Sequence, residues 1–229
     1  MAIQELFEIK TIHLRLLRRL NIIWNKDSYQ GSPMVYPKKP YGNSDIIGDV
    51  VKEMFGKTRD ECSKDEITEA LYIHREMHTV LEVVTSSGCF YPGEYRKHKS
   101  GNWVYAKFVN SPCDLYELLD LLQEEALKQD PESVEEFKRL DDKEAVYLFH
   151  NTLGKNLRNS YSLWDNKSPL HNWFLSQGIF HADDMSVIIL TSLHRKLKGQ
   201  DINLQEQIKN YQEYWKNAND NTGTTIFTI

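Results

Sequence analysis

The chain has 229 residues, with 28 basic and 33 acidic side chains, which give a formal net charge of −5. This composition, 40% apolar and 27% charged, is that of an ordinary globular protein and excludes a uniformly basic nucleic-acid binder. No apolar run approaches the ~18 residues that cross a membrane, and the first residues lack the pattern of a secretion signal. The three cysteines match no disulfide or zinc spacing, so we expect reduced thiols and a cytoplasmic protein.

The charge is divided unevenly along the chain. Residues 1–112 carry a net charge of +2, whereas residues 113–229 carry −7. We therefore expect two parts, an N-terminal helical part over 1–110 with aromatic and basic loops, and an acidic helical part over 111–229.

Helical signals dominate the first part. Apolar spacing predicts a helix over 3–24, followed by a proline- and tyrosine-rich loop over 25–43 and a short helix over 45–55. Ser63 opens an S-x-x-E capping box, which predicts a long helix that ends near Gly88.

Residues 89–108 are rich in β-forming residues around a Ser-Gly-Asn turn and predict one small β-hairpin. Aromatic and basic side chains alternate here, a mixture that suits a protein interface or a nucleic-acid contact. The structural alternative is that the rings pack the hairpin onto the helices. The candidate binding residues are Tyr91, Tyr95, Arg96, Lys97, Trp103 and Tyr105. If they bind a partner, Trp103→Ala or Tyr95→Ala should abolish binding without unfolding the protein.

The second part is helical throughout, which makes the expected fold mainly α and bundle-like, with the hairpin as its one β-element. A long helix is predicted over 143–164, and another over 182–198. The stretch 114–144 holds 12 acidic and four basic residues. It has the pattern of solvated amphipathic helices, or of an acidic surface that imitates DNA phosphates.

Two patterns suggest chemistry. His74 and His78 lie one helical turn apart, but no third ligand is evident, so we expect no metal site. The other set could form a polar pocket in which Arg158 binds an anion and His181, oriented by Asp183, acts as an acid or base. In the structural alternative Asp183 caps a helix and Arg158 pairs with an aspartate. The residues of this set are Arg158, Asn159, His181, Asp183 and Asp184.

The same segments carry a resemblance. The chain reads L-R-N-S-Y-S-L-W over 157–164 and F-H-A-D-D-M-S over 180–186. Over residues 145–217 it resembles an uncharacterised family of phage and bacterial proteins, a domain of unknown function, with R-N-x-x-x-L-W and H-x-D-D-M-S motifs. The resemblance implies a phage or prophage origin and no particular activity.

These features favour a non-enzymatic binding protein of a phage or mobile element, which occludes or modulates a host protein in the bacterial cytoplasm. No Gly-rich phosphate loop, G-x-S-x-G elbow or Cys–His pair of known spacing occurs, so we assign no catalytic residue and expect no cofactor. The alternative is an enzyme or sensor that acts on a nucleotide or another phosphorylated small molecule through Arg158, His181 and Asp183. Nucleic-acid binding by residues 89–107 is a third hypothesis, and the sequence leaves the oligomeric state open.

Overall fold

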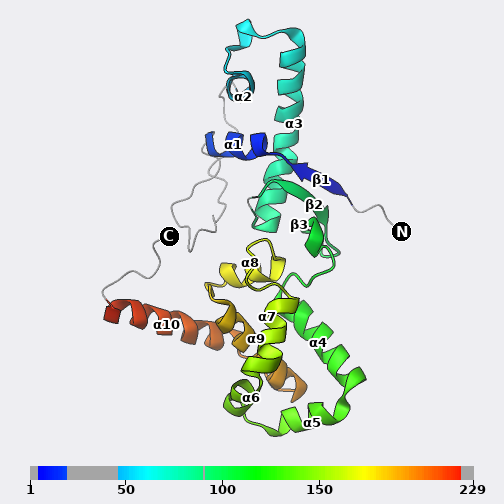
Figure 1. Ribbon diagram of the computed structural model, residues 1–229, viewed down its shortest axis with the longest axis vertical. Coiled ribbons are helices and arrows are strands. Elements are labelled where there is room, and N and C mark those ends of the chain that lie inside the picture. The colour runs from blue at the N-terminus through cyan, green and yellow to red at the C-terminus, as the bar shows by residue number, and fades with distance from the viewer. Residues whose placement is uncertain (1–4, 20–45, 90, 223–229) are drawn as a thin grey trace. The chain divides into compact units, whose positions relative to one another are not determined.

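The computed structural model describes residues 5–19, 46–89 and 91–222. The chain divides into two compact units, Met1–Asn110 (unit 1) and Ser111–Ile229 (unit 2), which are described separately below. The fold is mainly α-helical with a small antiparallel sheet, which confirms the predicted fold class (Figure 1). The predicted loop over 25–43 lies outside the described residues. No described helix is both long enough and apolar enough to span a membrane.

Unit 1 is built on the long helix α3 (Lys64–Ser87). Its capping box is formed as predicted, because the Ser63 hydroxyl accepts from Glu66 N at 3.2 Å and Glu66 Oε2 accepts from Ser63 N at 2.8 Å. Gly88 ends the helix in the left-handed conformation (φ 64°). Helices α1 (Thr11–Arg19) and α2 (Ile46–Phe55) pack against α3, and η1 (Arg59–Glu61) precedes it.

A three-stranded antiparallel sheet completes unit 1. The predicted hairpin is present as β2 (Gly93–Lys97) and β3 (Trp103–Tyr105), followed by η2 (Ala106–Phe108). The helix predicted over 3–24 is wrong in its first turns, because Leu6–Ile9 form strand β1, which pairs with β2. The exposure of β1 alternates, with Phe7 and Ile9 turned toward the core, so its apolar residues follow a period of two rather than 3.6.

The hairpin is held to α3 by its aromatic side chains. Tyr95 is fully buried, and Trp103 is 4% exposed. The indole Nε1 of Trp103 donates to Glu82 of α3 at 3.0 Å. The burial of both rings argues against the expectation that Trp103→Ala or Tyr95→Ala leaves the fold intact, since both substitutions empty part of the core.

Helix α9 (Ala182–Leu197) lies in the middle of unit 2, and the other helices of the unit are arranged around it (Figure 1). Ten of the sixteen residues of α9 are buried, and every other α-helix of the unit packs against it. The helices around it are α4 (Leu115–Gln129), α5 (Pro131–Arg139), α6 (Asp142–Phe149), α7 (Lys155–Ser160), α8 (Pro169–Ser176) and α10 (Leu204–Thr222).

The helix predicted over 143–164 is present as a continuous helical run over 142–160, in which a π-helical turn, His150–Gly154, joins α6 to α7, while residues 161–164 form a turn instead. Gly154 is the last residue of the π-helical turn. A Cβ there would lie 3.3 Å from Leu190 Cδ1 and 3.4 Å from Arg158 Nη1, so the glycine lets this turn approach α9 closely. Beyond α7 the chain turns at Ser162, whose φ is 52°.

The buried position of Trp103 predicts a large loss of stability on truncation. We expect Trp103→Ala to lower the free energy of unfolding by about 3–5 kcal/mol, as is typical for aromatic core truncations. Tyr72→Ala is the control, since Tyr72 is exposed on α3 of the same unit and should cost less than about 1 kcal/mol. Urea denaturation followed by circular dichroism measures both, and equal costs would contradict the assignment of Trp103 to the core.

Two buried histidines predict that stability falls in mild acid. Burial lowers the pKa of His13 and of His171, although hydrogen bonds to Glu76 and to the Leu163 carbonyl oppose the shift. In the unfolded chain both titrate near 6.5, so the unfolded state binds protons first and stability drops as the pH falls below about 6.5. Urea denaturation at pH 7.5 and 5.5 should show a lower midpoint at pH 5.5, and a smaller difference in His171→Gln.

Candidate functional site

The six hairpin residues predicted to bind a partner make mainly internal contacts. Tyr95 and Trp103 lie in the core, and the Tyr95 hydroxyl donates to the Tyr91 carbonyl at 2.9 Å. Burial raises the pKa of that hydroxyl. Lys97 Nζ lies 2.6 Å from Glu82 and 4.8 Å from the centre of the Trp103 ring. Arg96 and Tyr105 are partly exposed, so a partner would meet the outer edges of the hairpin rather than its buried rings.

The two histidines predicted one turn apart on a helix complete no metal site within the residues that the structure describes. His74 is half-buried and His78 exposed on α3, and within the described part of the chain neither belongs to a cluster of three metal-ligating side chains. Glu76, between them, instead accepts from His13 Nε2 at 2.8 Å.

The polar residues around the start of α9 do come together, through contacts among themselves. Arg158 is 8% exposed, with its Nε 3.1 Å from Asp183 Oδ1 and its Nη1 2.7 Å from the Ser186 hydroxyl. Asp184 accepts from Trp215 Nε1 at 2.7 Å, and burial raises the pKa of its carboxyl despite this bond. Asn159 lies next to Arg158 but is exposed.

These contacts define the role of His181. It is the N-cap of α9, with Nδ1 accepting from Asp183 N at 3.3 Å, so the structural alternative named the wrong cap when it chose Asp183. The same Nδ1 lies 3.4 Å from Asp183 Oδ2, so the ring is in contact with both the backbone and the carboxylate of Asp183. His181, Asp183 and Arg158 thus lie together as predicted, and their contacts are with one another and with the start of α9.

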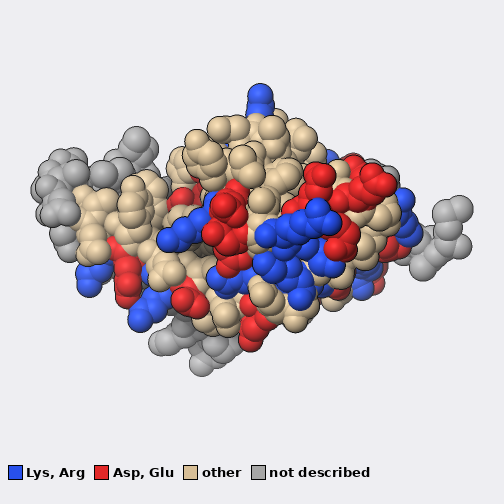
Figure 2. Space-filling model, turned by 90° about the horizontal axis from the view of Figure 1, so that it is seen from below, with Lys and Arg blue, Asp and Glu red and all other residues tan. Residues whose placement is uncertain are grey.

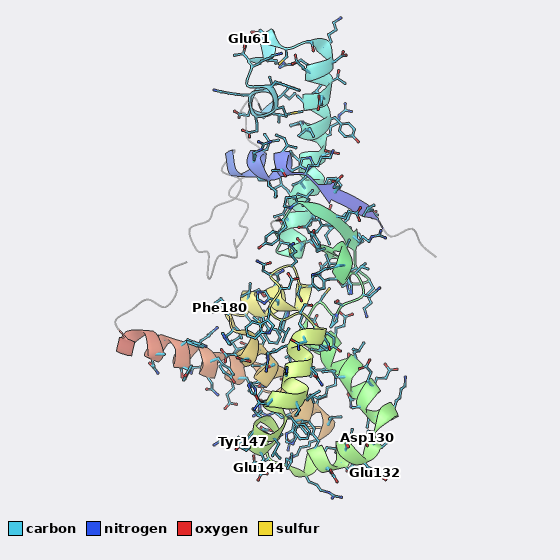
Figure 3. All side chains as sticks on the ribbon, viewed as in Figure 1. Glu61, Asp130, Glu132, Glu144, Tyr147 and Phe180 are labelled. Carbon is cyan, nitrogen blue, oxygen red and sulfur yellow. The ribbon has the colours of Figure 1, made fainter. Side chains whose placement is uncertain are left out.

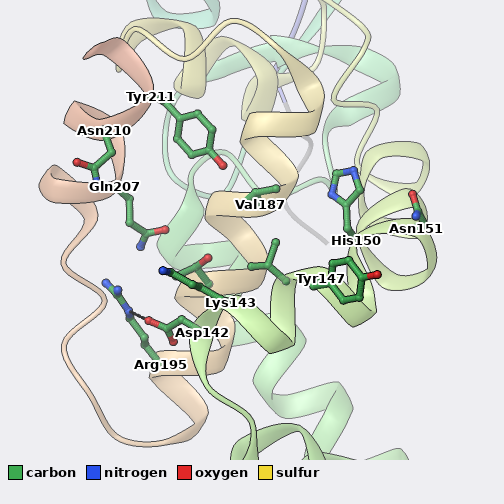
Figure 4. A pocket seen from close by; sticks show the side chains of 12 residues that line it. Asp142, Lys143, Tyr147, His150, Asn151, Val187, Arg195, Gln207, Asn210 and Tyr211 are labelled. Atoms are coloured by element: carbon green, nitrogen blue, oxygen red, sulfur yellow. Dashed lines mark hydrogen bonds and ion pairs between the residues drawn. The ribbon is translucent and has the colours of Figure 1, made fainter. Parts of the chain in front are cut away.

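A cleft of about 660 Å³ lies on another side of unit 2, between α6 with the π-helical turn, α9 and α10 (Figure 4). Its walls combine apolar and aromatic side chains with a few charged groups. The lining side chains include Asp142, Lys143, Tyr147, His150, Arg195 and Tyr211.

The Asp142 carboxylate of α6 lines the cleft. It accepts from His194 Nδ1 and from Arg195 Nε, each at 2.7 Å. Arg195 Nη1 also donates to the Ile202 carbonyl at 2.9 Å, which ties α6 to the segment before α10. Burial alone would raise the pKa of Asp142, but the bonds from Arg195 and His194 outweigh it and hold the pKa below its ordinary value.

Elsewhere in the cleft, some polar side chains have no hydrogen-bond or ion-pair partner among the described residues. Tyr211 reaches from α10 toward α9 (Figure 4), and burial raises the pKa of its hydroxyl to about 12. His150 Nδ1 is buried without a hydrogen-bond partner among the described residues, and Lys143 makes no ion pair to any of them. Tyr147 projects from α6 and is 83% exposed (Figure 3). The cleft thus offers apolar walls, one cation at the rim and an exposed aromatic ring.

The acidic stretch 114–144 does not form one unbroken acidic face. On the side shown in Figure 2, acidic and basic side chains lie intermixed. Several of its acids pair with bases, as in Lys128–Glu124, Lys138–Glu135 and Lys196–Asp120. Others, such as Asp130 and Asp141, cap helices, so the arrangement is that of solvated amphipathic helices.

Residues 112–197 match the family model of a domain of unknown function (DUF6794). The match covers the first six helices of unit 2 up to the end of α9, and includes the contacts of Arg158 and the Asp142 network. The description of DUF6794 carries no activity. No curated protein and no solved structure matches the chain.

The cleft extends past the DUF6794 match. Its walls from α6 and α9 lie inside residues 112–197, whereas Gln207, Asn210 and Tyr211 belong to α10 beyond them. The sequence predicted none of these residues as a site. The feature of the sequence that could have indicated the cleft is Tyr147, a large aromatic side chain that lies outside the apolar stripe of the predicted helix.

The bonds of Asp142 to His194 and Arg195 predict that Asp142 contributes more to stability than Asp120 does. The two aspartates pair with consecutive residues of α9, Asp142 with Arg195 and Asp120 with Lys196. Asp142→Asn should cost about 2–3 kcal/mol of unfolding free energy, because it leaves the mostly buried Arg195 without its countercharge. Asp120→Asn should cost less than about 1 kcal/mol, because Asp120 meets Lys196 in solvent. Urea denaturation of both variants at pH 7 measures the difference, and similar costs would show that the network is not what secures α6 to α9.

Proposed function

We propose that the protein is a binding protein that holds a segment of a partner protein in the cleft formed by its DUF6794 region and α10. The observation that carries the proposal is Tyr147, an aromatic side chain that is 83% exposed at the wall of the cleft. Tyrosine is among the residues that dominate protein interfaces, where its ring fills an apolar pocket and its hydroxyl hydrogen-bonds. Leu148, also exposed, extends the apolar surface of α6 next to it.

The charges support a partner that brings a carboxylate to the rim. Asp142 and Arg195 neutralise each other, which leaves Lys143 as the cation without a described countercharge. A partner segment with an apolar or aromatic side chain for the cleft and an acidic residue for Lys143 complements both features.

The competing hypothesis of a phosphate-binding enzyme or sensor has weaker support. It depends on a guanidinium that is available to an anion, and Arg158 already holds Asp183 and Ser186. His181 is likewise engaged as a helix cap.

The finer proposal is that the partner is a host protein and that the binder comes from a phage or a mobile element. Its support is the resemblance of residues 145–217 to phage and bacterial proteins. The cleft chemistry is independent of that origin.

The test is capture of a partner by the purified, immobilised protein from a bacterial lysate, with bound proteins identified by mass spectrometry. Tyr147→Ala should reduce recovery of the specific partner about tenfold or more, since an aromatic interface anchor contributes roughly 2 kcal/mol. Tyr116→Ala is the matched control, because Tyr116 is a tyrosine exposed on α4 of the same unit and does not line the cleft. Equal recovery by wild type and Tyr147→Ala would contradict the proposal.

A further inference from the structure

A second hollow lies near the end of α7 and has no lining residue in common with the cleft. This recess has a volume of about 440 Å³ and lies between the end of α7 and the turn that leads to α8. It is lined by Arg158, Asn159, Ser162, Trp164, Asp165 and Asn166.

The turn that forms the recess is fixed by backbone hydrogen bonds. Leu163 N donates to the Arg158 carbonyl at 2.9 Å, and Asp165 N donates to the Ser162 carbonyl at 2.9 Å. Ser168 N then donates to the Asp165 carbonyl at 2.8 Å. The backbone that carries the lining side chains is therefore fixed before any ligand arrives, which reduces the entropy that binding has to overcome.

Trp164 supplies an aromatic wall. Its ring meets His181 in a T-shaped contact, with centroids 5.4 Å apart and planes at 87°, and the residue remains 58% exposed. One contact thus orients the indole while most of its surface stays uncovered. An oriented, uncovered indole is a stacking surface for a flat ligand.

The charge of the recess selects against anions. Arg158 and Asp165 are the charged residues among those that line it, and Arg158 is further neutralised by Asp183. A phosphate would therefore meet a carboxylate and a guanidinium that is already paired. An uncharged ligand meets no such penalty.

Hydrogen-bonding groups complete the recess. Arg158 is nine-tenths buried, with its Nε 3.1 Å from Asp183 Oδ1 and its Nη1 donating to the Ser186 hydroxyl, so its guanidinium is held in place at the wall of the recess. The amides of Asn159 and Asn166 and the Ser162 hydroxyl add both donors and acceptors. This is the set of groups that reads the edge of a heterocycle whose donors and acceptors lie in one plane.

We propose that the recess binds an uncharged planar heterocycle of the nucleobase type, stacked on Trp164 with its polar edge toward Arg158 and the two asparagines. The base, rather than a phosphate, is what the site recognises. The proposal concerns a different surface from the cleft and does not depend on the partner protein proposed above.

Isothermal titration calorimetry with the four ribonucleosides, and with inorganic phosphate and ribose 5-phosphate, tests the class of ligand. At least one nucleoside should bind with a saturable isotherm, whereas inorganic phosphate and ribose 5-phosphate should not. The corresponding nucleoside monophosphate should bind no more tightly than its nucleoside. Failure of all four nucleosides at millimolar concentration, or equal binding of ribose 5-phosphate, would overturn the proposal.

Two variants locate the site. Trp164→Leu should weaken nucleoside binding roughly tenfold, whereas Trp164→Phe, which keeps a stacking ring, should weaken it much less. Tyr147→Leu, in the separate cleft, should leave nucleoside affinity unchanged. Circular dichroism melts of each variant verify folding, which the exposure of both side chains makes safe. Unchanged affinity in Trp164→Leu would show that the nucleoside binds elsewhere and would refute the assignment.

Discussion

The structure of unit 2 depends on the burial of one helix that contains polar residues. Helix α9 is covered along most of its length, yet it carries Ser186, Ser192 and His194 among its buried positions. Each of these polar groups needs a partner, since an unpaired buried donor or acceptor costs roughly 1–3 kcal/mol. Arg158 of α7 bonds Ser186, Gln207 of α10 bonds Ser192, and Asp142 of α6 bonds His194. Three helices are therefore placed around α9 by hydrogen bonds as well as by apolar packing.

This constraint gives the two sequence motifs a physical meaning. The arginine of the first motif and the aspartate and serine of the second are joined directly, through Arg158 with Asp183 and Ser186. The histidine of the second motif starts the buried helix as its N-cap. The same contacts consume the groups that a phosphate-binding site would need. Two surfaces of unit 2 remain for a ligand. One is the recess beside Trp164, and the other is the cleft between α6, α9 and α10.

Features set by neighbouring residues were predictable, and features set by distant ones were not. The capping box at Ser63 forms as expected, because it depends on residues within one turn of the helix. Strand β1 was missed because Leu6–Ile9 become a strand through pairing with β2, about ninety residues later. The candidate site was missed for the same reason, since Tyr147 and Tyr211 line one cleft only after α10 has packed against α9. The π-helical turn His150–Gly154 was not predicted, because apolar spacing over 143–164 indicates a helix without indicating a local change in its hydrogen-bond pattern.

Net charge was the weakest guide to binding. The value of −7 over residues 113–229 suggests an acidic surface, but much of that charge is used within the fold. Asp141 caps α6, Asp183 neutralises Arg158, and Asp142 compensates Arg195. After these pairings Lys143 is the cation of the cleft that makes no ion pair with any described residue, and the recess presents hydrogen-bonding groups with no surplus positive charge. Two surfaces of one acidic unit thus favour different ligands, because a ligand interacts with the charges left within a few ångströms and not with the sum over the sequence.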